Sequence, residues 1–226
     1  QFKDLPQASL PVKVPKDAVR LPLVLVDCFA RNSQIRSVVP DEVSGGFSAT
    51  KLLLEKGHRR IAMINADQKY PAAEGRLRGY RQALEDFGVP VKPELVRTGG
   101  WWQDDGYEHA SALLQGKQIP TAIFCANDRI AMGVYDALKE KGFRIPEDVS
   151  VVGFDNQELI AAHSRPPLTT VQIPYYEMGA WAVGQLIDAK SKENQSAFGP
   201  VTLECPLVLR ASVDRPSVES GGGRGA

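Results

Sequence analysis

Short apolar runs alternate with stretches of helical periodicity along most of the chain. The runs predict strands near residues 21–27, 37–39, 59–65, 95–98, 121–126, 149–154 and 202–210. Between them, apolar residues recur three and four positions apart, which predicts helices near 44–57, 74–87, 107–114, 127–141 and 174–189. This alternation is typical of an α/β fold on a parallel sheet, because each parallel strand needs a crossover connection.

The ends of several predicted helices carry residues suited to those positions. Gly57 and Gly88 each follow the last apolar residue of a helical stretch, where glycine adopts the left-handed conformation that ends a helix. Pro174 stands where the first turn of the last helix would begin, a position that tolerates a missing N–H. The boundaries therefore agree with the periodicity.

Composition narrows the class of protein. With 226 residues, 43% of them hydrophobic, the chain is long enough to bury a large core. The 27 basic and 27 acidic residues cancel, whereas a module that binds nucleic acid by itself usually carries a basic excess. The longest apolar runs, about six residues, are too short to span a bilayer, and the first 20 residues lack the apolar core of a signal peptide. We therefore expect a cytoplasmic protein that does not contact the membrane.

The sequence carries no recognisable catalytic or metal-binding motif. Cys28, Cys125 and Cys205 are far apart and lie beside apolar runs or a proline, as buried reduced thiols do. Neither a GxSxG motif, a phosphate-binding loop nor a GxGxxG follows any predicted strand. Asp104 and Asp105 are adjacent on a helix and point in different directions. We expect no metal, no cofactor and no enzymatic activity.

Several polar and aromatic side chains follow predicted strands directly. They are Asp27, Trp101, Asn127, Asp128 and Asp155. Ligands of parallel sheets bind outside the carboxyl ends of the strands, so these residues are candidates for one site. Carboxylates and amides bind hydroxyl groups, and an indole face packs on a sugar ring, so the set suits a polyhydroxylated ligand.

Each candidate also has an ordinary structural interpretation. Asn127 and Asp128 directly precede a helix, where both residue types are effective caps. Asp155 can be a turn residue, and Trp102, beside Trp101, can serve packing or lie at the surface. Arg76, in the string GRLRGY, can be a solvated helix charge. Spacing alone leaves both interpretations open.

Six strings in order, from about residue 21 to residue 212, resemble the LacI/GalR family of bacterial transcription regulators. They are KGHRRIAMI, GRLRGYRQAL, PTAIFCANDRIAMGVYDAL, IPEDVSVVGFDN, PPLTTV and PLVLRAS. The resemblance implies the type I periplasmic-binding-protein fold, with two Rossmann-like lobes of parallel sheet, three crossovers and a ligand cleft between the lobes. The first lobe looks incomplete, and the family's helix-turn-helix headpiece is not visible in this sequence.

The resemblance also implies roles and a division of the chain. Arg76 matches the arginine clamp of the cleft, Asp155 the carboxylate that receives ligand hydroxyls, and Trp101 the stacking aromatic. Asp27 matches an acidic contact from the first lobe, and Asn127 or Asp128 a position that lines the cleft. The expected division assigns residues 1–40 and 171–193 to the N-terminal lobe, 41–170 and 194–213 to the C-terminal lobe, and 214–226 to a disordered tail.

The function implied is that of an effector-binding and dimerisation region of a LacI-type regulator. A small-molecule effector, a sugar in preference to a nucleoside, would shift the affinity for operator DNA, which a homodimer would contact only through the headpiece. The alternative is a periplasmic sugar-binding protein of a transport system. A flavodoxin-like or Rossmann enzyme is a weaker rival, because the sequence lacks a cofactor fingerprint.

Overall fold

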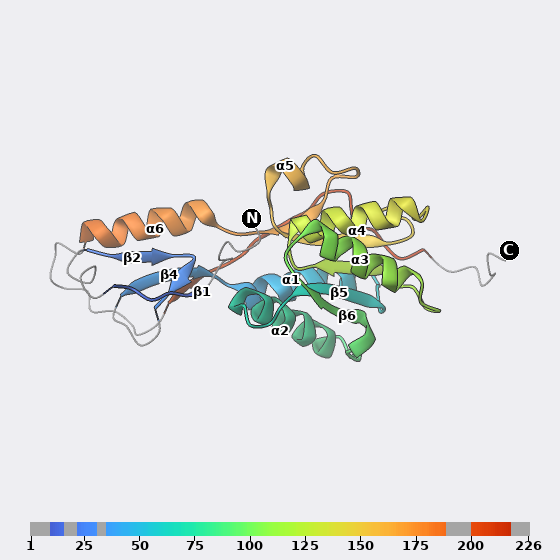
Figure 1. Ribbon diagram of the computed structural model, residues 1–226, viewed down its shortest axis with the longest axis horizontal. Helices are drawn as coiled ribbons and strands as arrows, with labels where there is room; N and C mark the ends of the chain where they lie inside the picture. Colours follow the sequence, from blue (N-terminus) through green and yellow to red (C-terminus); the bar gives the residue numbers. More distant parts are fainter. Residues whose placement is uncertain (1–9, 16–21, 31–34, 189–199, 218–226) are drawn as a thin grey trace.

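The computed structural model describes residues 10–15, 22–30, 35–188 and 200–217, which form two parts built on separate sheets. The parts lie end to end along the long axis of the molecule (Figure 1). Strands pair in parallel almost throughout, with helices against them. The expected α/β fold with two lobes of parallel sheet is confirmed.

The larger part contains a six-stranded sheet of order β11–β9–β8–β7–β5–β6. Its strands are β5 (Ile61–Ala66), β6 (Val96–Gly99), β7 (Ala122–Cys125), β8 (Ser150–Asp155), β9 (Thr169–Gln172) and β11 (Leu207–Val208). Only β11, which pairs with β9 at the edge, is antiparallel among these described strands. The central strands are buried on both faces, which explains why the sequence shows unbroken apolar runs there.

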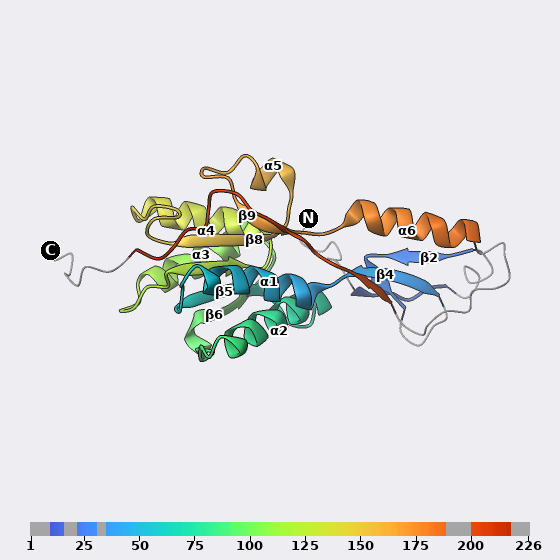
Figure 2. The same cartoon turned by 180° about the vertical axis from the view of Figure 1, so that it is seen from behind.

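Four long helices cover the two faces of this sheet, as Figures 1 and 2 show from opposite sides. They are α1 (Glu42–Glu55), α2 (Pro71–Asp86), α3 (Gln103–Leu114) and α4 (Asp128–Glu140). Successive residues of a strand alternate between faces, so Met63 packs with α1 and α2 while Ile64 packs with α3 and α4. Two short helical turns, η2 (Pro93–Leu95) and α5 (Glu158–Ala161), complete this part.

The smaller part is a three-stranded sheet of order β10–β4–β2 with one helix against it. Its elements are β2 (Val24–Val26), β4 (Arg36–Pro40), β10 (Val201–Leu203) and α6 (Tyr175–Asp188). A two-stranded pairing of β1 (Leu10–Pro11) with β3 (Cys28–Phe29) flanks it. No helix among the described residues is long and apolar enough to cross a membrane.

The chain passes between the two parts three times in the described ranges. The first passage joins β4 to α1, the second joins β9 to α6, and the third joins β10 to β11 (Figure 2). Three crossovers are the number that the family resemblance implied. The junction therefore brings together residues that are far apart in the sequence.

The details of the expected division differ from the structure at the third passage. A single strand over 202–210 was expected, but β10 pairs with β4 in the smaller sheet and β11 pairs with β9 in the larger one. Assigning 194–213 as a whole to the C-terminal lobe is therefore wrong at β10. The apolar runs also did not predict β9, a member of the larger sheet.

The C-terminal boundary also differs from the expectation. Asp214 was assigned to the disordered tail, yet its carbonyl accepts a hydrogen bond from His58 Nε2 at 2.8 Å, and its N–H donates to Ser150 Oγ at 3.1 Å. These bonds fasten the chain to the larger part as far as residue 214. The rest of the expected tail, from residue 218 onward, lies outside the described residues.

Close packing of α1 on α2 makes Gly79 a sensitive position. A Cβ added there would overlap the carbonyl oxygen of Val43 and lie 2.5 Å from Phe47 N, so Gly79→Ala must push the two helices apart. We expect the free energy of unfolding to fall by about 2 kcal/mol in urea titrations. In the control Gly179→Ala, on α6, the methyl meets no atom within 4 Å, and we expect a gain of about 0.5 kcal/mol. Equal effects of the two variants would contradict this account.

Candidate functional site

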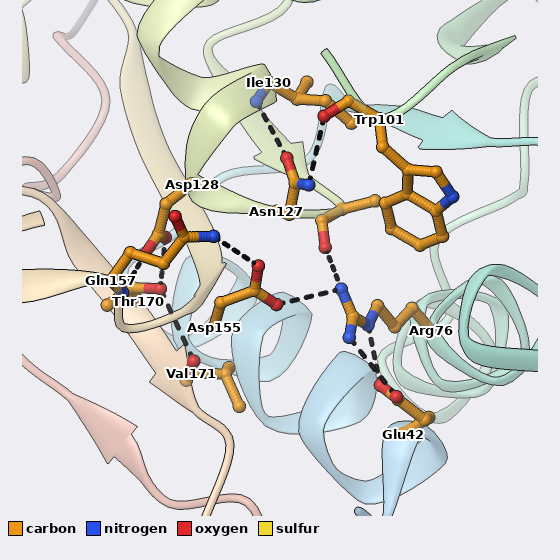
Figure 3. A network of polar contacts seen from close by, with 11 residues as sticks. Glu42, Arg76, Trp101, Asn127, Asp128, Ile130, Asp155, Gln157, Thr170 and Val171 are labelled. Atoms are coloured by element: carbon orange, nitrogen blue, oxygen red, sulfur yellow. Dashed lines mark hydrogen bonds and ion pairs between the residues drawn. The ribbon is translucent and has the colours of Figure 1, made fainter. Parts of the chain in front are cut away.

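A cluster of polar contacts connects side chains of α1, α2, β8 and α4 near the junction of the two parts (Figure 3). Glu42 opens α1 directly after the first passage, and Asp155 ends β8. Tyr175 follows the second passage, and burial raises its pKa, with a further rise from the carboxylate of Asp155. Cys205 lies on the third, where burial raises its thiol pKa to about 12 and the carboxylate of Glu42 raises it further. A relative movement of the two parts would therefore change the positions of these residues.

Arg76 of α2 is the centre of the cluster and is buried, with 1% of its surface exposed. Its Nε donates to Glu42 Oε2 at 2.6 Å and its Nη2 donates to Glu42 Oε1 at 3.2 Å. Its Nη1 donates to the carbonyl oxygen of Ala126 and to Asp155 Oδ1, the latter at 3.4 Å. The arginine therefore links α1, α2, β8 and the residue that follows β7.

The environment of Arg76 keeps it charged. Its guanidinium carbon lies 3.7 Å from the ring centroid of Phe154 and 5.4 Å from that of Trp101. Burial lowers the pKa of Arg76, but the carboxylates of Glu42 and Asp155 outweigh that effect and raise it overall. The interpretation of Arg76 as a solvated helix charge, which spacing left open, is therefore wrong.

Asp155 is the carboxylate of the cluster that retains some access to solvent. Its side chain is 14% exposed, and its Oδ2 accepts from Gln157 Nε2 at 3.0 Å. Burial raises its pKa to about 6, although the positive charge of Arg76 lowers it. Its φ of 103° is a left-handed value that a non-glycine residue rarely adopts, as is the φ of 53° at Asn156. Such strained backbone is concentrated at functional sites.

Asp128 is fully buried at the first turn of α4. Its Oδ1 accepts from Thr170 Oγ1 at 2.6 Å, and its Oδ2 accepts from the backbone N–H of Gln157 at 2.7 Å. Burial raises its pKa to about 7, and the negative charge of Asp155 raises it further. Asp128 therefore ties β9 and the loop after β8 to α4.

Asn127 and Trp101 are buried next to the cluster and bond each other. Asn127 caps α4, since its Oδ1 accepts from Ile130 N at 2.8 Å, and its Nδ2 donates to the carbonyl of Trp101 at 3.2 Å. The capping interpretation is therefore confirmed for Asn127. The cap uses the amide oxygen, and the bond to Trp101 uses the amide nitrogen, so both polar atoms of the side chain have a partner. Trp101, 5% exposed, packs edge-on to Tyr70 with centroids 6.0 Å apart. Its Nε1 has no partner among the described residues.

Asp27 is the predicted site residue that belongs to the smaller part. It follows β2 with a φ of 57°, and its N–H donates to the carbonyl of Val38 at 2.9 Å. Partial burial raises the pKa of Tyr175, and the carboxylates of Asp155 and Asp27 raise it further. The charges of one acidic residue from each part therefore act on Tyr175.

The sequence interpretation missed four residues of the site. These are Glu42, Gln157, Thr170 and Tyr175. Glu42 looks like an ordinary acidic residue in the first turn of a helix, which favours it there on its own. A signal that could have found Tyr175 was its place directly after Pro174, at the start of the last helix.

Other features of the described residues lie away from the cluster. A surface pocket of about 440 Å³ opens at the amino ends of β5 and β6 beside the end of α3, and it shares no residue with the cluster. No group of three or more His, Cys, Asp or Glu side chains in the described ranges could hold a metal ion. Asp105 caps the start of α3 by accepting from Gly100 N and Trp102 N, at 2.7 and 3.1 Å.

The cluster has the chemistry of a binding site for a hydroxylated ligand. Its partly exposed groups are carboxylate and phenol oxygens, which accept hydrogen bonds from hydroxyls. The groups beneath them are held by buried hydrogen bonds, so they need little rearrangement to receive a ligand. A nucleophile activated by a neighbouring base does not occur among the described contacts of the cluster.

Comparison with known proteins gives one matching family model and several relatives. A model described as a periplasmic binding protein-like domain matches residues 50–213. The ribose operon repressor of Haemophilus influenzae is 35% identical over 196 residues, which cover 87% of this chain and 58% of that protein. The chain therefore spans less than two thirds of the length of this relative.

Solved structures show the same architecture. The transcriptional regulator CelR in complex with cellobiose superposes with a TM-score of 0.73 at 35% identity, over 81% of this chain and 56% of that one. A sugar-binding transcriptional regulator of the LacI family from Escherichia coli, solved with phosphate, has a TM-score of 0.78 at 33% identity. That match covers 88% of this chain and 71% of the other.

Proposed function

Because the chain belongs to the LacI family of transcriptional regulators, we propose that it is the effector-binding region of such a regulator. A small molecule, a sugar in preference to a nucleoside, binds the cluster at the junction. Binding favours one arrangement of the two parts over the other, and this population shift changes the affinity for operator DNA. The chain itself catalyses no reaction.

The observation that carries the proposal is the position of the Arg76 cluster. Its partly exposed carboxylate, Asp155, lies at the carboxyl end of β8, where parallel sheets bind ligands. Asp27 follows β2 of the smaller part directly, so a ligand that reached both carboxylates would contact both parts at once. The cellobiose complex of CelR supports a sugar as the ligand class.

A ligand panel tests the proposal. The chain is titrated with monosaccharides, disaccharides and nucleosides, and its thermal midpoint and tryptophan fluorescence are followed. A ligand at 100 times its Kd adds about 2.7 kcal/mol of stability, which raises the midpoint of a protein this size by about 5–10 °C. Trp101 touches the cluster and gives the fluorescence change.

The controls separate binding at the cluster from binding elsewhere. Asp155→Asn should abolish the midpoint shift, because the amide replaces a carboxylate that accepts hydrogen bonds from ligand hydroxyls. Asp86→Asn, an exposed position at the end of α2, should leave the shift unchanged. A folded chain that no compound stabilises contradicts the proposal, as does a shift that survives Asp155→Asn.

The partners follow from the same family membership. We propose a cytoplasmic homodimer in which a helix-turn-helix segment of the whole protein contacts the operator, because the balanced charge of this chain offers little attraction for DNA. Light scattering after size exclusion would test the dimer. The transport alternative lacks support, since the relatives compared are a repressor and transcriptional regulators.

A further inference from the structure

We propose that the surface pocket at the amino ends of β5 and β6 is a second ligand site, which binds a phosphate monoester with an apolar body. The pocket has a volume of about 440 Å³, within the range of small-molecule sites. Its elements lie at the end of the larger part that faces away from the smaller part (Figure 1). The effector cluster lies at the opposite, carboxyl ends of the strands, so this inference does not depend on the proposed function.

Three segments that are far apart in the sequence form the pocket. Arg60 directly precedes β5, and Glu94 and Leu95 belong to η2, before β6. Residues 116–118 follow α3. Leu95 and Leu113, 4% and 5% exposed, add apolar side chains to the lining. The pocket therefore offers apolar surface beside charged groups, which is the usual composition of a small-molecule site.

Arg97 of β6 carries the group in the pocket that lacks a partner. Val96 packs on the face of the sheet that α1 and α2 cover, so the next residue, Arg97, points to the face that α3 covers. The Nε of Arg97 is buried, yet it forms no hydrogen bond within the described ranges. A buried N–H without an acceptor is unfavourable. An anion in the pocket would supply the acceptor, because Arg groups bind phosphate through two parallel N–H bonds.

The lining carries a net positive charge. It contains Arg60, Arg97 and Lys117 against one carboxylate, Glu94, which leaves a net charge of +2. Arg60 donates its Nε and Nη2 to the carbonyl of Gln118 at 2.9 and 2.6 Å, which uses two of its five N–H groups. Glu94 and the carboxyl end of α3 oppose an anion, but a dianion balances the lining as a whole. A phosphate monoester carries most of that charge at neutral pH, and a single carboxylate carries half of it.

Calorimetric titration with phenyl phosphate tests the site, and inorganic phosphate and phenol, at the same ionic strength, test the two halves of this probe. We expect saturable binding of phenyl phosphate with a Kd below about 1 mM, weaker binding of inorganic phosphate and no binding of phenol. The order follows because the phosphate pairs with Arg97 and the ring covers Leu95 and Leu113. Absence of saturable binding of phenyl phosphate would overturn the proposal. Equal affinities for phenyl phosphate and inorganic phosphate would contradict the apolar body of the ligand.

Two pairs of variants locate the probe in this pocket. Arg97→Gln should weaken the binding of phenyl phosphate by about tenfold or more, because it removes the charge that the phosphate meets. The exposed Arg81→Gln on α2 should leave the affinity unchanged. Lys117→Gln, at an exposed position of the lining, should weaken binding by about threefold. Its control is Lys51→Gln on α1, at the opposite face of the sheet.

Circular dichroism checks that each variant folds. If Arg97→Gln does not fold, Lys117→Gln decides the question, because an exposed side chain contributes little to folding. Binding that survives the substitution of both residues would overturn the assignment.

A last variant separates this site from the effector site. Asp155→Asn should leave the affinity for phenyl phosphate unchanged, and a change would show that the probe binds at the junction instead. If a sugar binds at the junction and phenyl phosphate does not bind, the proposed function stands and the second site is rejected. If phenyl phosphate binds through Arg97 and no sugar or nucleoside binds, the second site stands and the proposed function fails.

Discussion

Arg76→Met should lower the free energy of unfolding by about 3–5 kcal/mol at pH 7.5, the cost of leaving a buried ion pair with one partner. Glu42 is 7% exposed, and without Arg76 it would face the charge of Asp155 with no cation between them. The variant would also strip the carbonyl of Ala126 of its donor. This loss is the largest that we expect from a single substitution.

The matched control is Arg78→Met on the same helix. Arg78 is exposed, and a surface substitution of this kind changes stability by about 0.5 kcal/mol or less. Urea unfolding of both variants at one pH gives the comparison. If Arg76→Met falls within 1 kcal/mol of Arg78→Met, as judged against the ranges above, then the pair with Glu42 does not stabilise the junction.

A double variant isolates the pair itself. In Glu42→Gln with Arg76→Met both charges are gone, so the uncompensated carboxylate that makes the single variant costly is removed. We expect the double variant to recover about 2 kcal/mol of the loss. Additive effects of the two substitutions would show that Arg76 acts through its contacts with Phe154 and Ala126 instead.

The fold was largely predictable because its strongest signals are local. Met63 and Ile64 lie in an unbroken apolar run because their strand is buried on both faces, and the periodicity of Leu77 and Tyr80 follows from one helix face packing on the sheet. The left-handed φ values of 101° at Gly57 and 65° at Gly88 agree with the predicted helix ends. Each of these features depends on a few neighbouring residues.

The short strands were not predictable for the opposite reason. β10 and β11 have three and two residues, and each exists only because a strand far away in the sequence pairs with it. β9 was hidden by the prolines that precede it, which are more typical of a loop. Pairing with a strand that is distant in the sequence produces no periodic pattern within these short segments, so the sequence alone does not predict them.

The candidate site was predictable in position and less so in its contacts. The rule on carboxyl ends of strands correctly brings Asp155, Asp128 and Asn127 together, but their ligand-binding roles stay predictions. The resemblance implied that Arg76 is the clamp of the cleft, and this role stays a prediction. The structure adds a partner that was not predicted, Glu42, which lies 34 positions away. That pairing depends on how α1 packs on α2, which no periodicity within either helix specifies.

Asp128→Asn should stabilise the protein increasingly as the pH rises. The folded state holds the pKa of Asp128 at about 7, above its ordinary value of 3.8, because burial disfavours the charged form. A carboxyl whose folded pKa is raised contributes stability below its unfolded pKa and loses it as the pH rises through the folded pKa. The wild type therefore carries a penalty at pH 8 that the neutral amide avoids.

The size of the effect follows from the same two values. The separation between 3.8 and about 7 corresponds to about 4 kcal/mol, so the stability difference between Asp128→Asn and the wild type should grow by about that amount from pH 4 to pH 8. The amide can satisfy both neighbours, since Oδ1 accepts from Gln157 N and Nδ2 donates to Thr170 Oγ1. Taking the difference between the two proteins removes the contribution of His58, whose pKa is lowered by burial in both.

Urea unfolding at half-unit pH steps measures this difference, with Asp136→Asn as the control on the exposed face of the same helix. Asp136 accepts a hydrogen bond from Gln103 Nε2 at 2.6 Å but stays exposed to solvent, so its replacement should give a much smaller dependence on pH than that of the buried Asp128. A flat difference for Asp128→Asn, or a variant less stable than the wild type at pH 8, would mean that Asp128 is not strained by its charge. In the expected case, the effector site is held together by a carboxylate that the protein keeps buried at a cost in stability, as a site selected for ligand recognition can do.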